Sequence, residues 1–236
     1  MTSPDVSELR RARRDAGLYG RRKGKALRPY QAGLIADLLP KLQLDLSARI
    51  EAPNNLFPDS PVDYWLEIGF GGGERLAADA EAHPRLAFFA CEPFVNGVAK
   101  LLVEIEQRGL RNIRIHPGDA GDLIDALPDN SLSGVYLLYP DPWPKRRHRS
   151  RRFVSDSMLI RLARVLRPGG ELRFATDIDD YAGWTLARIL RSPDFVWPAR
   201  SVHDWMTPWA GWTQTRYEAK ALREGRRPAY LTFVRR

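Results

Sequence analysis

The chain has 236 residues, 44% of them hydrophobic, which is enough for one α/β domain with a sizeable core plus an extension. Its net charge of +8 favours a polyanionic partner, either nucleic acid or an acidic membrane surface. The single cysteine, Cys91, excludes an internal disulfide and a cysteine zinc site, and no apolar run is long enough for a signal peptide or membrane span, so we expect a soluble, cytoplasmic, metal-free protein.

The first part of the chain is polar and basic up to about residue 30. It offers few apolar groups to offset the entropy of ordering. The first fifteen residues favour a solubilising tail, whereas Arg21 to Arg28 leads into the folded part and could dock on RNA or close over a site. We therefore predict a basic N-terminal extension over residues 1–55, disordered in its first part, and a folded domain over residues 56–236.

Leucines and isoleucines between Leu34 and Leu42 keep a roughly helical spacing, which Pro40 interrupts. The proline- and asparagine-rich stretch from Pro53 to Pro61 then predicts a loop, which sets the domain boundary.

Residues 64–73, Tyr-Trp-Leu-Glu-Ile-Gly-Phe-Gly-Gly-Gly, predict a buried strand that runs into a glycine-rich turn, and good helix formers follow from Glu74. Strand, glycine turn and helix open a nucleotide-binding βαβ unit, because glycines let the backbone approach a ligand closely. A dinucleotide fingerprint beginning at Gly69 would need glycine or alanine at position 74, where Glu74 is a poor neighbour for a pyrophosphate.

The alternative pattern E-x-G-x-G-x-G fits fully, with Glu67, Gly69, Gly71 and Gly73. In this stretch the chain resembles the class I S-adenosylmethionine (SAM) methyltransferases. That resemblance implies SAM as the cofactor, whose sulfonium and ammonium charges suit an acid at a strand end. A tight turn that binds no ligand is the other interpretation of the same residues.

Further buried strands are predicted in chain order, each bounded by turn residues: Leu86 to Cys91, Ile113 to Ile115, Val135 to Tyr139, Leu172 to Ala175, and Tyr230 to Val234. Helical spacing lies between them, over Val98 to Ile105, over Met158 to Leu166 as far as Pro168-Gly169-Gly170, and over Trp184 to Leu190. The alternation predicts an α/β, Rossmann-like fold with a mainly parallel, doubly wound sheet and helices on both faces.

Five successive strands end in a carboxylate, namely Glu67, Glu92, Asp119, Asp141 and Asp177. Ligands of open α/β sheets bind outside the carboxyl ends of the strands, so we expect these acids to converge on one crevice. Any one of them could instead be a helix N-cap. Glu92 has the place of an acid that accepts from both ribose hydroxyls, and Asp119 resembles the methyltransferase acid that accepts from the adenine amino group.

The least generic stretch is Tyr139-Pro140-Asp141-Pro142-Trp143-Pro144-Lys145, in which three prolines stiffen the loop around the acid. A basic run follows directly, Arg146-Arg147-His148-Arg149-Ser150-Arg151-Arg152. An acid beside dense positive charge suits a site where a polyanion delivers a planar base, with the run gripping phosphates and Trp143 stacking or walling the pocket. A solvated face or a localisation signal is the alternative reading of the run.

At this motif the chain resembles the bacterial single-chain tRNA (guanine-N7-)-methyltransferases, from about residue 56 to the end and again near Tyr19 to Gln31. The resemblance implies methyl transfer from SAM to guanine N7 in tRNA, in the variable loop, forming 7-methylguanosine. It places SAM contacts on Glu67, Gly69, Gly71, Gly73, Glu92, Asp119 and Asp141, and makes Asp141 the catalytic acid. It places substrate contacts on Lys145, Asp177 and Thr215-Arg216-Tyr217-Glu218, and RNA contacts on Arg147, His148, Arg149, Ser150, Arg151 and Arg152.

The stretch Thr215 to Glu218 matches the family motif T-x-[FY]-E and is also a capping box, with Thr215 as N-cap and Glu218 at N3 of a helix that ends near Gly225. Two other functions are alternatives for this sequence: a methyltransferase for a protein or small acidic metabolite, and an RNA-binding protein with a vestigial cofactor fold. The proline-rich signature argues against the first and the row of strand-end acids against the second. We expect no obligate protein partner and no membrane, and the sequence leaves monomer and homodimer open.

Overall fold

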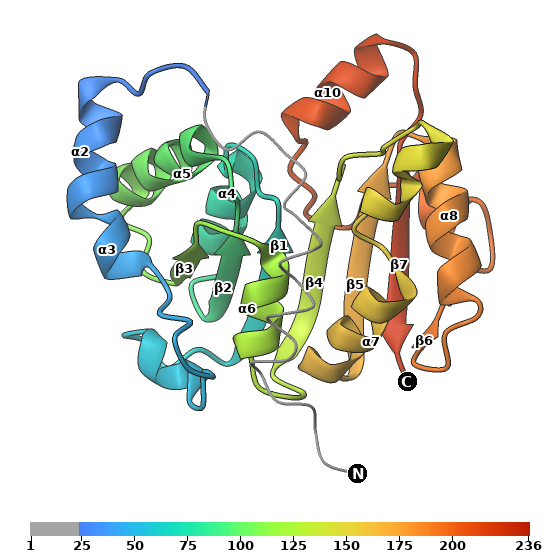
Figure 1. The fold of residues 1–236 in the computed structure, drawn as a ribbon, viewed down its shortest axis with the longest axis horizontal. Coiled ribbons are helices and arrows are strands. Elements are labelled where there is room, and N and C mark those ends of the chain that lie inside the picture. The colour runs from blue at the N-terminus through green and yellow to red at the C-terminus, as the bar shows by residue number, and fades with distance from the viewer. Residues whose placement is uncertain (1–23) are drawn as a thin grey trace.

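The computed structural model describes residues 24–236, which form one seven-stranded sheet in the order β3-β2-β1-β4-β5-β7-β6 (Figure 1). The strands are β1 (Asp63–Ile68), β2 (Leu86–Cys91), β3 (Ile113–His116), β4 (Leu132–Leu138), β5 (Leu166–Thr176), β6 (Phe195–Val196) and β7 (Ala229–Arg235). Strands β1 to β5 pair in parallel, and β7 runs antiparallel between β5 and β6. The predicted fold class is confirmed, and the predictions for residues 1–23 lie outside the described residues.

Helices cover both faces of the sheet (Figure 1). One layer contains α2 (Pro29–Asp37), α3 (Leu39–Leu42), α4 (Glu74–Ala82) and α5 (Val95–Arg108). The other contains α6 (Ala120–Ala126), α7 (Asp156–Val165) and α8 (Asp179–Ile189). The remaining elements are η1 (Pro53–Leu56), η2 (Arg146–Arg151), α9 (His203–Met206) and α10 (Arg216–Arg223).

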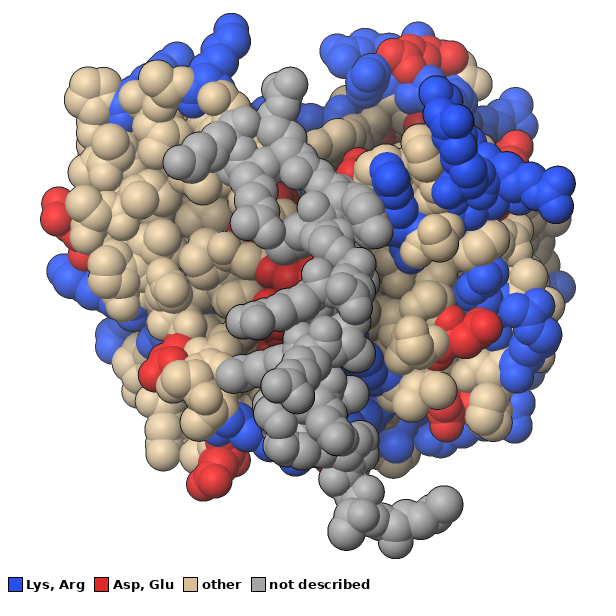
Figure 2. All heavy atoms as spheres, in the orientation of Figure 1, with Lys and Arg blue, Asp and Glu red and all other residues tan. Residues whose placement is uncertain are grey.

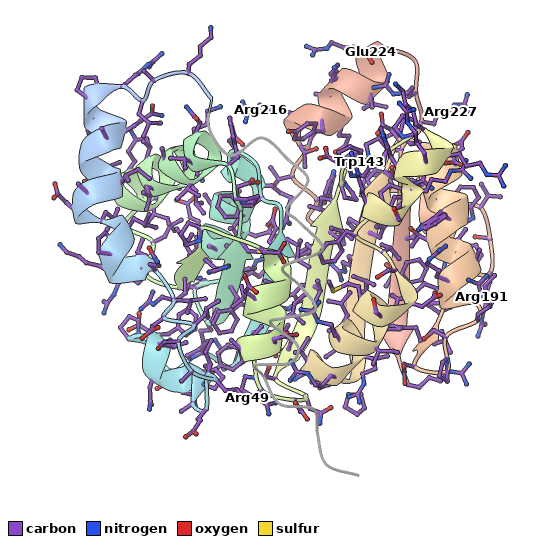
Figure 3. The ribbon with its side chains drawn as sticks, in the orientation of Figure 1. Arg49, Trp143, Arg191, Arg216, Glu224 and Arg227 are labelled. Carbon is purple, nitrogen blue, oxygen red and sulfur yellow. The ribbon has the colours of Figure 1, made fainter. Side chains whose placement is uncertain are left out.

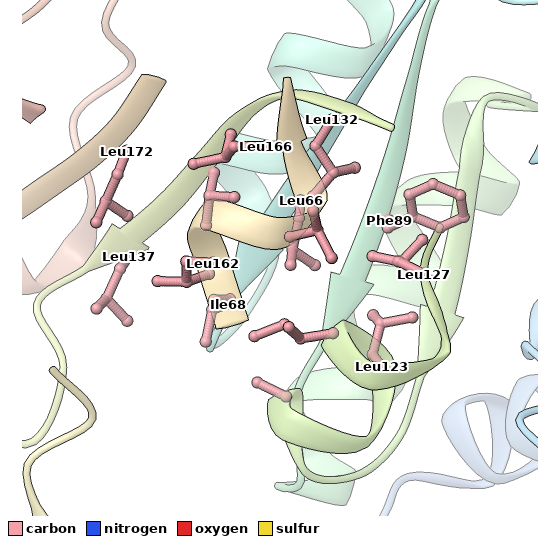
Figure 4. Packing of buried hydrophobic residues seen from close by; sticks show 14 of the residues in the cluster. Leu66, Ile68, Phe89, Leu123, Leu127, Leu132, Leu137, Leu162, Leu166 and Leu172 are labelled. Carbon is pink, nitrogen blue, oxygen red and sulfur yellow. The ribbon is translucent and has the colours of Figure 1, made fainter. Parts of the chain in front are cut away.

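The core lies on both sides of the sheet, because the parallel strands are buried on both faces. In β2, Phe88 and Ala90 pack against α4 and α5, while Phe89 and Cys91 point to the layer of α6 and α7. Figure 4 shows this second layer, in which leucines of α6 and α7 fill the space over β1, β4 and β5. Such a core fixes the register of the strands and therefore the positions of the residues that follow them.

The chain order reverses direction across the sheet between β1 and β4. From β1 it proceeds outward through β2 to β3, and then returns to β4 on the other side of β1. Such a topological switch point leaves a crevice outside the carboxyl ends of the two central strands, where ligands of this fold class bind. The glycine turn after β1 and the proline-rich loop after β4 both start at this crevice.

Two local predictions are wrong, and two short elements were not predicted. The helical spacing is interrupted at Leu38, between α2 and α3, and not at Pro40. Pro40 lies in the first turn of α3, where a missing N–H removes no hydrogen bond within the helix. Pro168-Gly169-Gly170 lies inside β5, where the ladder to β4 changes register between Leu132 and Gly134, instead of separating helix and strand. The two-residue strand β6 and the single-turn helix α9 carry too little periodicity to be predicted.

The stretch from Val196 to Trp212 is rich in tryptophan, and its last two tryptophans pack on one face of the sheet. Trp209 and Trp212 pack edge-on against Tyr230, and the two indole centroids are 5.2 Å apart. Together with Tyr136 of β4 they form a small core over β4, β5 and β7. Within residues 24–236, none of the helices has the length and apolar character that a membrane span requires.

Candidate active site

The glycine turn after β1 adopts a backbone that only glycine accepts easily. Gly69, Gly71 and Gly73 have φ of +71°, +60° and +77°, and Gly73 directly precedes α4. Helix α5 lies close beneath the turn, since a Cβ on Gly97 would stand 2.2 Å from the Gly71 carbonyl oxygen. A Cβ on Gly69 would meet no atom within 4 Å, so the turn has open space on its outer side.

Glu67, at the end of β1, is buried and forms an ion pair with Arg75 of α4. Burial raises the pKa of Glu67, and the Arg75 guanidinium opposes that rise. Arg75 also pairs with Asp79, and its guanidinium lies 4.0 Å from the ring centroid of Tyr136 and 5.6 Å from that of Trp212. The acid of the glycine motif is thereby held to the helix that follows it.

Glu92, which follows β2, connects the end of that strand to the glycine turn. One carboxylate oxygen accepts from the Gly71 N–H at 2.8 Å and the other from the Phe94 N–H at 3.0 Å. Burial raises the pKa of Glu92, and the negative charges of Asp141 and Glu67 raise it further. Three of the strand-end acids therefore lie near enough to affect one another.

Asp119 follows β3 and is half-buried; its carboxylate caps α6 by accepting from the Gly121 N–H at 2.7 Å. The prediction that one of these acids is a helix N-cap is therefore confirmed for Asp119. A cap uses part of one carboxylate and leaves lone pairs on both oxygens for other donors.

Asp141 stands in a loop with an unusual backbone. Tyr139 and Trp143 have φ of +49° and +43°, which is costly for residues with large side chains. Partial desolvation raises the pKa of Asp141, whose side chain remains exposed at the crevice. Strain of this kind persists where the surrounding structure imposes it, and it concentrates at functional sites.

Three acids at this edge of the sheet, Glu92, Asp119 and Asp141, differ from Glu67 in their partners. Among residues 24–236, no lysine or arginine forms an ion pair with any of the three. Carboxylates without a basic partner favour a positively charged ligand. A sulfonium cofactor with an amino group and a ribose fits both this charge and the open space over Gly69.

Beside the acids, η2 forms a basic lip (residues 145–151). Lys145, Arg146, Arg147 and Ser150 are exposed, and Arg149 pairs with Asp180 at 2.7 Å. The Trp143 ring meets His148 edge-on at 5.8 Å between centroids, and the Arg151 guanidinium lies 5.0 Å from its centroid. Figure 2 shows Lys and Arg side chains gathered at the upper right of this face, with acidic side chains near its middle.

Arg152 departs from the expected arrangement, because its side chain is fully buried. It donates to the Pro142 carbonyl at 2.8 Å, pairs with Asp180, and lies over the rings of Tyr181 and Trp184. The structure places Arg152 under the proline-rich loop and apart from the exposed lip.

Asp177 follows β5 at the same edge, and its carboxylate accepts a hydrogen bond from the Arg226 Nε–H at 2.6 Å. The carboxylate is largely buried, with 15% exposure. Asp177 therefore ties the segment after α10 to the end of β5.

Helix α10 begins with the capping box in full. Thr215 Oγ1 accepts from the Glu218 N–H at 3.1 Å, and the Glu218 carboxylate accepts from the Thr215 N–H at 3.3 Å. Glu218 is buried and also accepts from Trp212 Nε1 at 2.6 Å and from the Tyr230 hydroxyl. The helix is thus fixed to the tryptophan cluster by a single buried carboxylate.

The start of α10 covers the glycine turn and closes a pocket at the switch point. Arg216 pairs with Glu74 at 3.1 Å, and a Cβ on Gly71 would lie 3.7 Å from the Tyr217 ring. The pocket has walls from three segments: the turn and the start of α4 (Glu67, Gly69, Phe70, Gly72, Glu74, Arg75), the end of β4 (Leu138, Tyr139), and α10 with its lead-in (Gln214, Thr215, Arg216, Tyr217).

The sequence did not point to Arg75 or Gly97 as parts of this site, and it left the tryptophan-rich stretch that contains Trp212 open as either core or a wall of the base pocket. Gly97 carried a weak signal, since an isolated glycine inside a helical pattern often marks close packing. Arg75 carried no signal, because a charged residue in a first helical turn has an ordinary explanation. Among the described residues, no His, Cys, Asp and Glu cluster is arranged to hold a metal ion.

Comparison with known proteins agrees with this geometry. The family model Methyltransf_4, described as "Putative methyltransferase", matches residues 62–230. A protein of Nitrobacter winogradskyi named "tRNA (guanine-N(7)-)-methyltransferase" is 56% identical over 95% of this chain and 88% of its own length. Its namesake from Agrobacterium fabrum is 52% identical over 98% of this chain and 100% of its own length.

Solved structures with low identity share the fold. The 16S rRNA methyltransferase KamB superposes with a TM-score of 0.55 at 17% identity, covering 80% of this chain and 96% of its own. An rRNA methylase from Streptococcus thermophilus gives a TM-score of 0.50 at 12% identity, covering 80% and 99%. These two likenesses concern the fold alone.

Proposed function

The chain belongs to the tRNA (guanine-N(7)-)-methyltransferase family, and from that premise we propose that it transfers a methyl group from SAM to guanine N7 in tRNA. The observation that best supports this activity is the contrast at one sheet edge. Glu92, Asp119 and Asp141, which have no basic partner among residues 24–236, follow parallel strands at this edge, and the exposed basic lip comes shortly after Asp141. The first suits a cationic methyl donor and the second a polyanionic acceptor.

For the cofactor, we place the methionine part of SAM over Gly69 and Gly71, its ribose at Glu92, and its adenine near Asp119. When bound, SAM supplies an electrophilic methyl group on a sulfonium. Glu92 keeps free lone pairs beside the bonds that it accepts from Gly71 and Phe94, so it can still accept from ribose hydroxyls. Glu67 and Gly73 support the turn: Glu67 through Arg75, and Gly73 by its left-handed backbone.

For the base, the chain must supply orientation and electrostatics. Guanine N7 carries a lone pair and no proton, so methylation needs no general base. We propose that Asp141 accepts from the guanine N1–H and amino group, which fixes the ring and stabilises its growing positive charge. Asp177 is the second candidate, but its carboxylate already binds Arg226, which favours Asp141.

For the tRNA, we propose that Arg147, His148, Arg149, Ser150 and Arg151 contact phosphates at the variable loop. Lys145, Arg216 and Tyr217 then contact the nucleotide, while Thr215 and Glu218 hold α10 in place. Arg152 leaves this set, since its buried side chain supports the loop. A cytoplasmic location is proposed from the tRNA substrate.

The test is to incubate the full chain with methyl-labelled SAM and unmodified tRNA, and to digest the RNA to nucleosides. We expect the label in 7-methylguanosine, and in the variable-loop fragment after partial digestion. Label in another nucleoside, or none in RNA, would contradict the proposal. Equilibrium dialysis with SAM separates a protein that binds RNA without a cofactor from an enzyme with a different acceptor.

A further inference from the structure

Helix α10 carries a basic stripe on its outer side. Arg216, Lys220 and Arg223 follow one another at i, i+4 and i+7, which places them along one face of the helix. The two buried residues of the helix, Glu218 and Ala221, lie on the opposite face. The stripe therefore points away from the sheet, and Arg227 follows after the turn at Gly225, whose φ is +74°.

The segment that follows this stripe and the basic lip are both anchored by ion pairs at the end of β5 and the start of α8. Arg226 pairs with Asp177 at 2.6 Å, while Arg149 pairs with Asp180 at 2.7 Å. Two segments that are distant in the sequence are thus anchored to neighbouring positions, Asp177 directly after β5 and Asp180 in the first turn of α8. Figure 3 shows Arg216 at the start of α10 and Arg227 beyond its end, with Trp143 of the lip below them.

Not every charge on this surface is available to a ligand. Arg216 binds Glu74, Arg226 binds Asp177 and Glu224, and Lys220 lies 3.9 Å from Glu224. Arg223 and Arg227 are exposed, and within residues 24–236 neither forms an ion pair. On this surface, Arg223 and Arg227 therefore carry positive charge that no acidic side chain of residues 24–236 neutralises.

We propose that Arg223 and Arg227 form a phosphate-binding surface for tRNA that continues the basic lip along the end of α10. The inference rests on the proposed function and adds a second place where the enzyme holds its substrate. An exposed arginine without an acidic partner can bind a phosphate without first breaking an ion pair. The contact also releases counterions from the RNA, which favours binding. A solvated helix face would explain the charges equally, but it would not account for the two ion pairs, Arg226 with Asp177 and Arg149 with Asp180, that anchor the segment after α10 and the lip to neighbouring positions.

The test compares Arg223→Gln, Arg227→Gln and the double variant with Arg49→Gln. Arg49 is also an exposed arginine, but it lies at the opposite end of the sheet (Figure 3). For each full-length protein, the Kd for unmodified tRNA is measured at several KCl concentrations. We expect each single variant to raise Kd about 3–10-fold and to reduce the slope of log K against log salt by about 1, as for one lost phosphate contact. Arg49→Gln should leave both quantities unchanged.

Different experimental outcomes would contradict this inference and the proposed function. If the wild-type chain forms no 7-methylguanosine, the proposed function fails, whatever the binding data show. If it methylates tRNA while both arginine variants bind tRNA like Arg49→Gln, the surface proposal fails. It also fails if the variants lose only their binding to anionic lipid vesicles, or lower kcat at saturating tRNA with unchanged Kd.

Discussion

Glu67 and Arg75 form an ion pair inside the molecule, with each side chain only 4% exposed. The Arg75 guanidinium also lies against Tyr136 and Trp212, and Trp212 donates to Glu218 of α10. A continuous set of contacts therefore joins the acid of the glycine motif to the helix that covers the pocket. We infer that Glu67 serves the cofactor site by holding the turn in place.

We expect Arg75→Met to lower the free energy of unfolding by about 3–5 kcal/mol, because it leaves the Glu67 carboxylate buried without its partner. The double variant Glu67→Gln with Arg75→Met should recover most of that loss. Urea unfolding measures both. Arg108→Met is the control, since Arg108 pairs with Glu104 and Glu81 near the surface and should cost about 0–1 kcal/mol. A similar cost for the two single arginine variants would contradict the inference.

Asp141→Asn should lose turnover and gain stability at neutral pH. The raised pKa of Asp141 means that the folded chain binds this proton more tightly than the unfolded chain, so the ionised carboxylate opposes folding. The Asn variant should therefore melt at a higher temperature at pH 7, and the difference should shrink as pH falls toward the unfolded value of about 3.9. We expect turnover to fall about 10²–10³-fold. Thermal melts at two pH values and 7-methylguanosine assays measure these effects, and an unchanged turnover would remove Asp141 from its proposed role.

The fold could be predicted from the sequence because its signals are local. The strand before Gly69, the acids after each parallel strand and the capping box at Thr215 depend on a few neighbouring residues. The pairing of Glu67 with Arg75, the burial of Arg152 and the contact of Gly97 with the turn depend on packing between distant segments. Sequence spacing carries no direct record of such packing, so an arginine in a basic run looks the same whether it is exposed or buried.

Substitution of Arg152 should lower stability, whereas substitution of Arg147 should weaken tRNA binding. Arg152→Ala removes a buried side chain that pairs with Asp180 and donates to the Pro142 carbonyl, so we expect a loss of about 2–3 kcal/mol in unfolding free energy. Arg147 is exposed, and Arg147→Ala should change stability by less than about 0.5 kcal/mol. The same Arg147 variant should raise the Kd for tRNA about 3–10-fold and flatten its salt dependence. Urea unfolding and filter binding measure these effects, and equal stability of the two variants would place Arg152 back on the exposed lip.

Thr215→Ala tests whether the motif at the start of α10 acts through the helix cap. The hydroxyl accepts from the Glu218 N–H, and its loss should cost about 1 kcal/mol and loosen the start of the helix over the pocket. We expect a higher KM for tRNA with a smaller change in kcat. Thr215→Ser keeps the hydroxyl and should restore both stability and KM. If the serine variant stays as impaired as the alanine variant, the cap does not explain the role of this residue.

Gly97→Ala should weaken SAM binding through packing alone. The added Cβ would stand 2.2 Å from the Gly71 carbonyl oxygen and 3.1 Å from the Glu92 side chain, so α5 or the glycine turn must shift. Because both Gly71 and Glu92 are proposed to hold SAM, we expect its Kd to rise about 10-fold or more, with a stability loss of about 1–3 kcal/mol.

Gly183, in α8, offers a matched control, since a Cβ there meets nothing within 4 Å. Gly183→Ala should gain about 0.5–1 kcal/mol of stability and leave SAM affinity unchanged, because alanine only lowers the entropy cost of the helix. Equilibrium dialysis and urea unfolding compare the pair. Wild-type SAM affinity in Gly97→Ala would show that the turn tolerates displacement and that its contact with α5 does not position the cofactor.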